Sequence, residues 1–373
     1  VCRRPVAPLR WRERGCAMAD AKRLYYLDNL RVALTMLLVA HHVGQAYGPT
    51  GGSWPIQEAA RSAILGPLFT IDRSFFMSLF FLISGYFSAA SYDAKGGWPF
   101  VRGRLLRLGL PILVWALLMI PLQIFVFGAP GGGMKAWPID VGHLWFLEHL
   151  LLFSLFYALW RTIRRNHHPS AFQAPRLPRT WAILLFAVLL AAASGLIRIP
   201  FPIDRWVYLL GFFRVMFADV PRDLSFFVLG LIAYRRQWLT GFSSRAGRAW
   251  LAVAVLLASL VAVYDLGLSD RFPIGEPAWG VLYVTWESLF CCAACIGLLV
   301  LFRDRVNGHG WLARALAKSQ FAAYIIHVPV ILAFQYAVLD LAIPPLAKFT
   351  LVTAVSIPAT FAAAYAVRKP LHL

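Results

Sequence analysis

Residues 31–42 read Arg-Val-Ala-Leu-Thr-Met-Leu-Leu-Val-Ala-His-His, an apolar run that begins with an arginine and ends with two histidines. On an α-helix, Arg31 and His42 are separated by about three turns, so their side chains share one face and lie about 16 Å apart along the axis. The run belongs to a stretch long enough to cross a membrane. Because ionisable side chains inside a span are costly unless they face the protein interior, the pair is a candidate functional site.

The composition of the whole chain indicates a membrane protein. Of its 373 residues, 60% are hydrophobic and 14% are charged. A soluble domain has about 45–50% apolar and about 25% charged residues. An apolar excess of this size cannot be buried in one soluble core, so it requires a surrounding lipid bilayer.

Runs of about 20 apolar residues predict an all-α, polytopic transmembrane helical bundle of about ten spans. We expect residues 25–370 to form its single domain, and residues 205–217 to be a re-entrant or interfacial piece. The expected spans are about 30–49, 71–90, 108–128, 143–161, 181–198, 222–235, 249–267, 277–302, 320–340 and 347–367.

The net charge of +19 is a topology signal in such a chain. If the N-terminus is cytoplasmic, the loops on that side hold 27 of the 36 Lys and Arg residues. Short cytoplasmic loops of membrane proteins carry this excess. We therefore expect both termini in the cytoplasm, and we expect no nucleic-acid partner.

Two regions receive no functional role. Residues 1–24 form a basic N-terminal segment without the apolar run of a secretory signal, and an over-extended gene start is one interpretation of residues 1–17. Cys291, Cys292 and Cys295 lie inside an expected span, where buried cysteine acts as a small hydrophobic residue. We therefore expect neither a disulfide framework nor a metal site.

Five motifs, in this order and at these intervals, resemble the membrane acyltransferase 3 family. They are Tyr25–Arg31 leading to His42, Phe80–Phe87, Arg102–Pro111, His143–Leu147 and Tyr324–His327. The resemblance implies an integral-membrane O-acyltransferase, in a multi-pass arrangement in the bacterial inner membrane. It implies transfer of an acetyl or succinyl-type group from a cytoplasmic acyl-CoA to a hydroxyl of an extracytoplasmic glycan or glycolipid, with no bound cofactor.

His42 matches the histidine that follows the family's arginine, and it is the candidate catalytic residue. Acyl transfer to an alcohol needs a base, and histidine suits this role because its pKa is near neutrality. The alternative is a hydrogen-bonded histidine that only packs helices. His41 is rotated by about 100° on the helix and is expected to face a neighbouring helix or lipid. We expect Asp28 to form an ion pair with Arg31.

The candidate donor site consists of Arg31, Arg102, Arg104 and Arg107. The last three lie where the third expected span enters the membrane from the cytoplasm. Arginine grips phosphate oxygens with paired hydrogen bonds, and the CoA donor that the resemblance implies carries several phosphates. Ordinary positive-inside anchoring remains the alternative for each arginine of the cluster.

Buried polar residues elsewhere are candidates to bind the acceptor or line the site. Glu148 and His143 lie near the outer end of the fourth span, and a carboxylate there must face the bundle interior or a wet cavity. Tyr324 and His327 are one helical turn apart and either line the site or stabilise the bundle. Glu287 either belongs to the site or forms an internal ion pair.

Two mechanisms and one rival function stay open at this point. His42 either deprotonates the acceptor hydroxyl or transiently takes the acyl group itself. The rival is a proton-coupled transporter of an anion or lipid-linked sugar, with His42, Glu148 and Glu287 lining its path. Against it, the chain lacks the inverted repeats common in such transporters. The acyl group, the acceptor and the oligomeric state leave no readable mark in the sequence.

Overall fold

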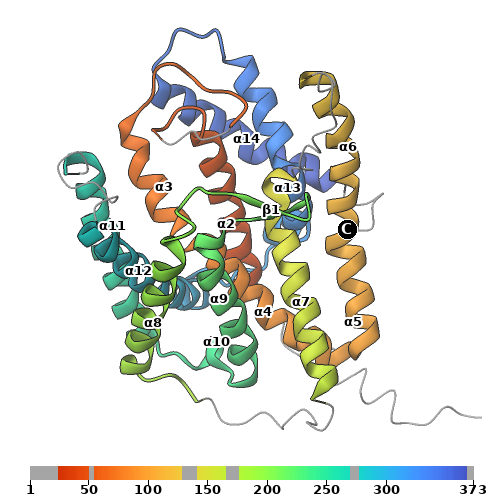
Figure 1. The fold of residues 1–373 in the computed structure, drawn as a ribbon, viewed down its shortest axis with the longest axis vertical. Helices are drawn as coiled ribbons and strands as arrows, with labels where there is room; N and C mark the ends of the chain where they lie inside the picture. The colour runs from red at the N-terminus through yellow and green to blue at the C-terminus, as the bar shows by residue number, and fades with distance from the viewer. Residues whose placement is uncertain (1–23, 50–53, 128–140, 165–175, 269–276, 368–373) are drawn as a thin grey trace, which may run out of the picture.

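The described part of the chain is a helical bundle. The computed structural model describes residues 24–49, 54–127, 141–164, 176–268 and 277–367 (Figure 1). Its longer helices are α2 (Tyr25–Gly44), α3 (Gly66–Arg73), α4 (Phe76–Lys95), α5 (Gly97–Arg104), α6 (Leu110–Phe127), α7 (Trp145–Ile163), α8 (Thr180–Arg198), α9 (Val220–Arg235), α11 (Ser244–Gly267), α12 (Pro277–Arg305), α13 (Trp311–Ala337) and α14 (Pro345–Val367). Shorter elements are α10 (Trp238–Gly241), the 3-10 turns η1 (Ala63–Leu65), η3 (Gly142–Leu144) and η4 (Phe217–Asp219), and the π-helical turn η2 (Leu105–Gly109).

The prediction of an all-α membrane bundle is confirmed. Within the described ranges, seven helical segments are long and apolar enough to cross a membrane, and each coincides with an expected span. The other three expected spans correspond to α2, α6 and α9, which are not among these seven. The count of ten spans and the cytoplasmic termini remain predictions. The basic segment 1–24 lies almost entirely outside the described residues.

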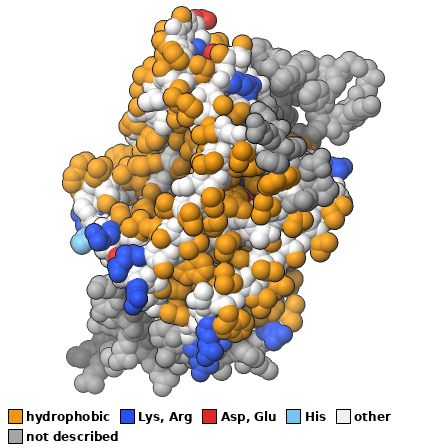
Figure 2. Space-filling view, turned by 90° about the vertical axis from the view of Figure 1, so that its left-hand side faces the viewer, with side chains coloured by type: hydrophobic (Ala, Val, Ile, Leu, Met, Phe, Trp, Pro, Cys, Tyr) orange, Lys and Arg blue, Asp and Glu red, His pale blue; other side chains and the backbone are white. Residues whose placement is uncertain are grey.

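The outer surface of the bundle is apolar where lipid would contact it. Figure 2 shows one broad hydrophobic face with Lys and Arg side chains gathered toward its lower end. Large hydrophobic side chains are exposed along α8 and α11, including Leu189 at 60% and Val263 at 64%. In water such a surface would drive aggregation, so its extent fits a protein whose solvent is the bilayer.

Small residues allow the tightest helix contact. A Cβ atom on Gly85 of α4 would come within 2.1 Å of the Phe227 carbonyl oxygen of α9, and one on Gly230 of α9 would come equally close to the Leu82 carbonyl oxygen. Glycine at both positions lets the two backbones touch, as is common between membrane helices. This contact fixes α4, which carries part of the site described below.

The join between α5 and α6 has π-helical hydrogen bonding over Leu105–Gly109. Pro111 follows it. Proline has no N–H to donate to the carbonyl four residues earlier, here that of Arg107, and its ring crowds that carbonyl. A wider π turn relieves this conflict, and such turns are frequent at functional sites. The turn therefore gives Arg107 a backbone unlike that of a regular helix.

Residues 205–217, expected to be re-entrant or interfacial, contain an antiparallel hairpin of β1 (Val207–Leu209) and β2 (Phe213–Val215). Its loop consists of Leu210, Gly211 and Phe212, and the first two have left-handed φ values of 54° and 79°. In Figure 1 the hairpin crosses the front of the bundle near α7. This short sheet is the one departure from helix among the described elements.

Candidate active site

Three histidines from distant parts of the chain meet inside the bundle. The rings of His42 and His327 have centroids 4.9 Å apart, and those of His327 and His143 are 4.7 Å apart. His42 lies on α2, His143 in η3 and His327 on α13. The structure thus joins three of the predicted site residues.

The hydrogen bonds of these rings define their tautomers. His42 Nδ1 lies 3.0 Å from the Leu38 carbonyl oxygen, and His327 Nδ1 lies 2.6 Å from that of Tyr324. A carbonyl oxygen only accepts hydrogen bonds, so both Nδ1 atoms carry the proton in the neutral ring. The Nε2 atoms of both rings therefore hold a free lone pair. An imidazole in this form is ready to accept a proton.

Pro329 explains how His143 is held. It lies inside α13 and cannot donate to the Ile325 carbonyl, which is four residues earlier. His143 Nε2 donates to that freed carbonyl at 2.9 Å. The Tyr324 hydroxyl in turn donates to the His143 carbonyl oxygen. One proline therefore creates the acceptor that fastens η3 to α13.

A cavity of about 1150 Å³ extends from the basic end of the bundle to Tyr324. Arg31, Arg104 and Arg107 all line it, as does Asp28. The expected ion pair is present, with Arg31 Nη1 3.8 Å from Asp28 Oδ1. Ring contacts lead from Tyr324 to His327 at 5.9 Å and from His327 to His42 at 4.9 Å. Tyr324 therefore lies between the cavity and the histidines, and His42 itself does not line the cavity.

The arginines of this cavity affect one another. Arg104 donates to Ser88 Oγ at 3.0 Å, and the Arg107 guanidinium lies over the Phe321 ring. Arg104 precedes the third expected span. Burial, followed by the positive charges of Arg107 and Arg31, lowers the pKa of Arg104 to about 10. The three guanidinium groups therefore repel one another. Binding of an anionic ligand among them would relieve this repulsion.

Arg102, the fourth donor-site candidate, is exposed and does not line the cavity. Two residues apart on one helix, the side chains of Arg102 and Arg104 point to nearly opposite sides. Ser88, which accepts from Arg104, was not among the predictions, and neither were several polar residues of the cavity lining, such as Gln320 and Arg235. Ser88 lies one helical turn after Ser84 of the second motif, a spacing that could have signalled a shared face.

Glu148 binds the backbone of the hairpin. Its Oε2 accepts the backbone N–H of Arg214 at 3.1 Å, while His149 Nε2 donates to the Arg214 carbonyl at 3.2 Å. Two adjacent residues of α7 therefore bind the backbone N–H and C=O of one residue of β2. The Glu148 carboxylate is buried, as expected, and it accepts this backbone hydrogen bond.

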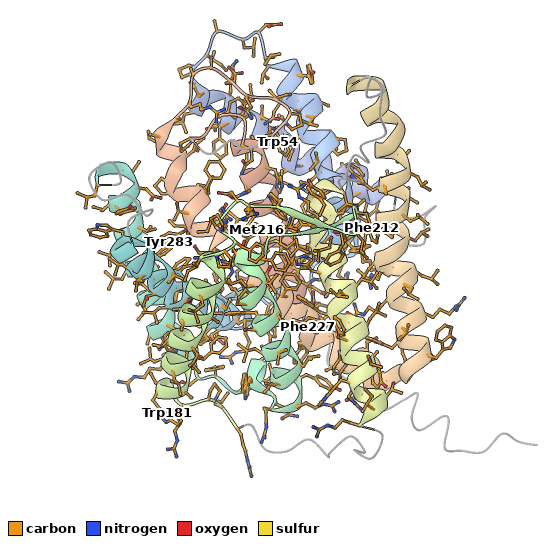
Figure 3. The ribbon with its side chains drawn as sticks, in the orientation of Figure 1. Trp54, Trp181, Phe212, Met216, Phe227 and Tyr283 are labelled. Carbon is orange, nitrogen blue, oxygen red and sulfur yellow. The ribbon has the colours of Figure 1, made fainter. Side chains whose placement is uncertain are left out.

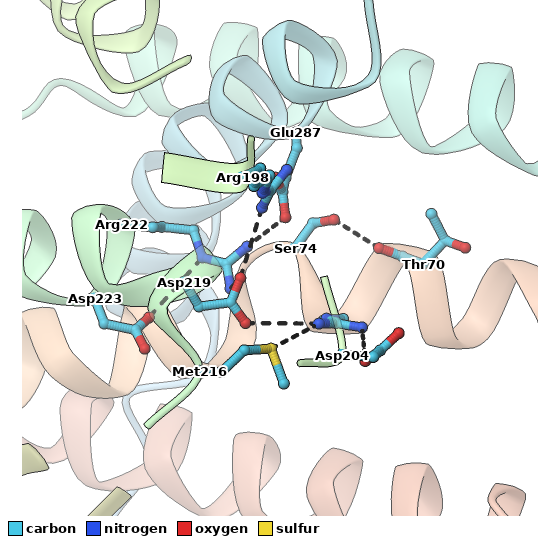
Figure 4. A network of polar contacts seen from close by, with 10 residues as sticks. Thr70, Ser74, Arg198, Asp204, Met216, Asp219, Arg222, Asp223 and Glu287 are labelled. Atoms are coloured by element: carbon cyan, nitrogen blue, oxygen red, sulfur yellow. Dashed lines mark hydrogen bonds and ion pairs between the residues drawn. The ribbon is translucent and has the colours of Figure 1, made fainter. Parts of the chain in front are cut away.

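Glu287 has the internal ion pairs that were one of its two alternatives. It lies 2.7 Å from Arg198 and bonds to Arg222 (Figure 4). Asp219 lies 3.2 Å from the same Arg222. This network ties α8, α9 and α12 together. Among the described residues its ion-pair partners are these arginines and not the histidines, so the geometry does not support Glu287 as a residue that lines the histidine cluster.

His41 faces a neighbouring helix. Its Nδ1 lies 2.9 and 3.0 Å from the two oxygens of Asp72, on α3. The Asp72 carboxylate is 2% exposed, and the pair holds α3 against the end of α2 beside His42. Among the residues that the structure describes, no group of three or more His, Cys, Asp or Glu side chains is arranged to hold a metal ion.

The fold and the site together define an integral-membrane helical bundle in which an arginine-lined cavity leads toward buried imidazoles. A family model described as an acyltransferase domain matches residues 24–367, and the chain belongs to this acyltransferase 3 family. It is therefore a membrane acyltransferase. The motifs that carry the resemblance are most similar to the branch that contains glucans biosynthesis protein C.

Comparison with curated proteins agrees with that branch. The chain is 26% identical over 335 residues to glucans biosynthesis protein C of Escherichia coli strain K12, covering 84% of this chain and 83% of the relative. The same values hold for the protein of that name from Escherichia coli strains SMS-3-5 and O81. No solved structure matches the chain.

Proposed function

We propose that this protein transfers an acetyl or succinyl-type group from acyl-CoA, bound from the cytoplasm, to a hydroxyl of an extracytoplasmic glycan or glycolipid. The observation that carries the proposal is the meeting of Arg31, Arg104 and Arg107 on the wall of one cavity. Its volume of about 1150 Å³ is slightly above the usual range for ligand sites, so it has room for a donor of this length.

The charge of the cavity wall favours a phosphorylated donor. Guanidinium groups bind phosphate oxygens through paired hydrogen bonds, and a CoA carries a diphosphate and a further phosphate. With the phosphates at the basic end, the thioester would extend toward Tyr324 and the histidines behind it. Tyr324 has to turn aside for the thioester to reach His42.

In the proposed reaction, His42 is the base. Its Nε2 takes the proton of the acceptor hydroxyl, and the hydroxyl oxygen attacks the thioester carbonyl carbon. The carbon–sulfur bond then breaks. The CoA thiolate leaves and takes the proton from the His42 imidazolium, so the products are the ester and free CoA.

The test uses purified protein in proteoliposomes that contain the acceptor lipids and glycans of the cell envelope. Labelled acetyl-CoA and succinyl-CoA are supplied separately on the outside of inside-out vesicles. We expect one of them to label the glycan fraction in step with release of free CoA, and His42→Ala to abolish both. The matched control is His309→Ala, a change in an exposed histidine. Full transfer by His42→Ala, or no transfer by the parent protein, would refute the proposal.

Mass spectrometry of the intact protein separates the two possible routes. Direct transfer predicts an unchanged mass after mixing with acyl-CoA alone. An acyl group retained on the peptide that contains His42 would instead show that this imidazole takes the acyl group first.

A further inference from the structure

Trp54 lies against His42 on the side away from the arginine cavity. The two ring centroids are 5.5 Å apart, with the planes inclined at 54°. His327 contacts the same imidazole from α13. Arg31, which lines the donor cavity, lies near the start of α2, and His42 lies near its end. Trp54 therefore lies at the end of α2 that is farther from the donor cavity. Figure 3 places its side chain near the upper end of the bundle.

The orientation of the Trp54 indole is fixed from inside the bundle. Its N–H donates to Gln335 Oε1 at 2.8 Å, and Gln335 Nε2 donates to the Val43 carbonyl at 3.1 Å. Gln335 is completely buried. Since Val43 directly follows His42, this glutamine ties the indole to the backbone beside the catalytic candidate. A tryptophan that only anchored the bilayer surface would direct its N–H toward water or headgroups.

The chain after Trp54 is also held in place. Glu58 Oε1 lies 2.7 Å from Nζ of the buried Lys348, and Arg61 donates to the Gly48 carbonyl at 3.0 Å. Arg61 and Gln57, which are exposed, bond to each other at 2.8 Å. The half-buried Trp54 indole is thus followed, within the next few residues, by the exposed side-chain amide of Gln57 and the exposed guanidinium of Arg61. Such groups recognise hydroxyls.

We propose that Trp54 binds the acceptor as a sugar, by stacking a pyranose ring on the indole beside His42. The C–H bonds on one face of a pyranose are weakly positive and apolar, and they complement the negative face of an aromatic ring. Hydroxyls at the rim of the sugar would then reach Gln57 and Arg61. This inference deepens the proposed function, since it names what lies on the acceptor side of the base.

The first test compares Trp54→Leu, which removes the aromatic face, with Trp54→Phe, which keeps it and loses the N–H. The acceptors are a β-glucan oligosaccharide and phosphatidylglycerol, an alcohol without a sugar ring. For the oligosaccharide we expect Trp54→Leu to raise KM about tenfold, the effect of one lost stacking contact, with KM for acyl-CoA unchanged. Trp54→Phe keeps an aromatic face but loses the bond that orients it, so it should raise KM less than Trp54→Leu does. Trp311→Leu, at a tryptophan that is 76% exposed, is the matched control.

A binding measurement separates this inference from the proposed function. Isothermal titration calorimetry with the β-glucan oligosaccharide needs no acyl donor. Binding to the parent protein and about tenfold weaker binding in Trp54→Leu would support the inference even if no acyl transfer were found. It is overturned if Trp54→Leu binds the oligosaccharide like the parent, if Trp54→Phe is impaired as much as Trp54→Leu, or if acylation of phosphatidylglycerol falls equally.

Discussion

The imidazole rings of His42 and His327 lie edge to face, with centroids 4.9 Å apart and an angle of 74° between their planes. His327 is fully buried, and its Nε2 has no hydrogen-bond partner among the described residues. A polar nitrogen left bare in the interior is costly, and such atoms tend to persist where function requires them. This contact links the candidate base to the residues that border the donor cavity.

His327→Gln tests whether that contact positions the base. We expect kcat to fall by about a hundredfold, the lower part of the range for acid–base groups, because His42 loses the ring against which it packs. KM for acyl-CoA should not change, since His327 does not line the cavity. Initial rates at saturating and limiting donor separate the two constants. His309→Gln serves as control, and a rise in KM with kcat intact would contradict the assignment.

Arg104→Gln and Arg107→Gln test the donor site. Each removes a cation from the cavity wall, so we expect KM for acyl-CoA to rise about tenfold or more, the effect of one lost charge-assisted hydrogen bond. Arg102→Gln provides a close control, because Arg102 has the same charge, lies on α5 with Arg104 and does not line the cavity. An equal rise in KM for all three variants would indicate a general surface-charge effect and not a donor site.

Glu287→Gln tests the buried ion-pair network. The change leaves Arg198 and Arg222 facing a neutral amide, and breaking a buried pair in this way costs about 3–5 kcal/mol. We expect a lower thermal unfolding midpoint in detergent. Asp204→Asn should have little effect, because the Asp204 side chain is 74% exposed and surface pairs contribute about 0–1 kcal/mol. Equal stability of the two variants would argue against this account of the network.

Gly85→Ala tests the contact between α4 and α9. The new methyl group would lie 2.1 Å from the Phe227 carbonyl oxygen, so the helices must separate. We expect a loss of about 1–3 kcal/mol in stability, as for other overpacked sites. Gly103→Ala, where a Cβ has no neighbour within 4 Å, should be neutral or stabilising. Thermal unfolding of both variants measures the difference, and an unaffected Gly85→Ala protein would refute the close approach.

Much of the fold could be predicted, because an apolar segment in a bilayer has few structures open to it. A run such as residues 249–267 has to become a membrane helix, since lipid offers its backbone no other hydrogen-bond partner. The site was harder to predict. Arg31, Arg104 and Arg107 were grouped through motifs, and the structure brings them together. Arg102 belongs to the same motif, yet helical rotation exposes it.

By itself, the sequence determined a polytopic helical bundle, its family and the identity of the residues able to do acid–base chemistry. Only the tertiary structure decided which of them meet. Periodicity shows which face of a helix is polar, but it does not say which other helix that face contacts. His42 therefore meets His327 and Trp54, Glu287 pairs with two arginines, and Pro329 frees a carbonyl for His143, because packing between distant segments sets helix rotation and depth.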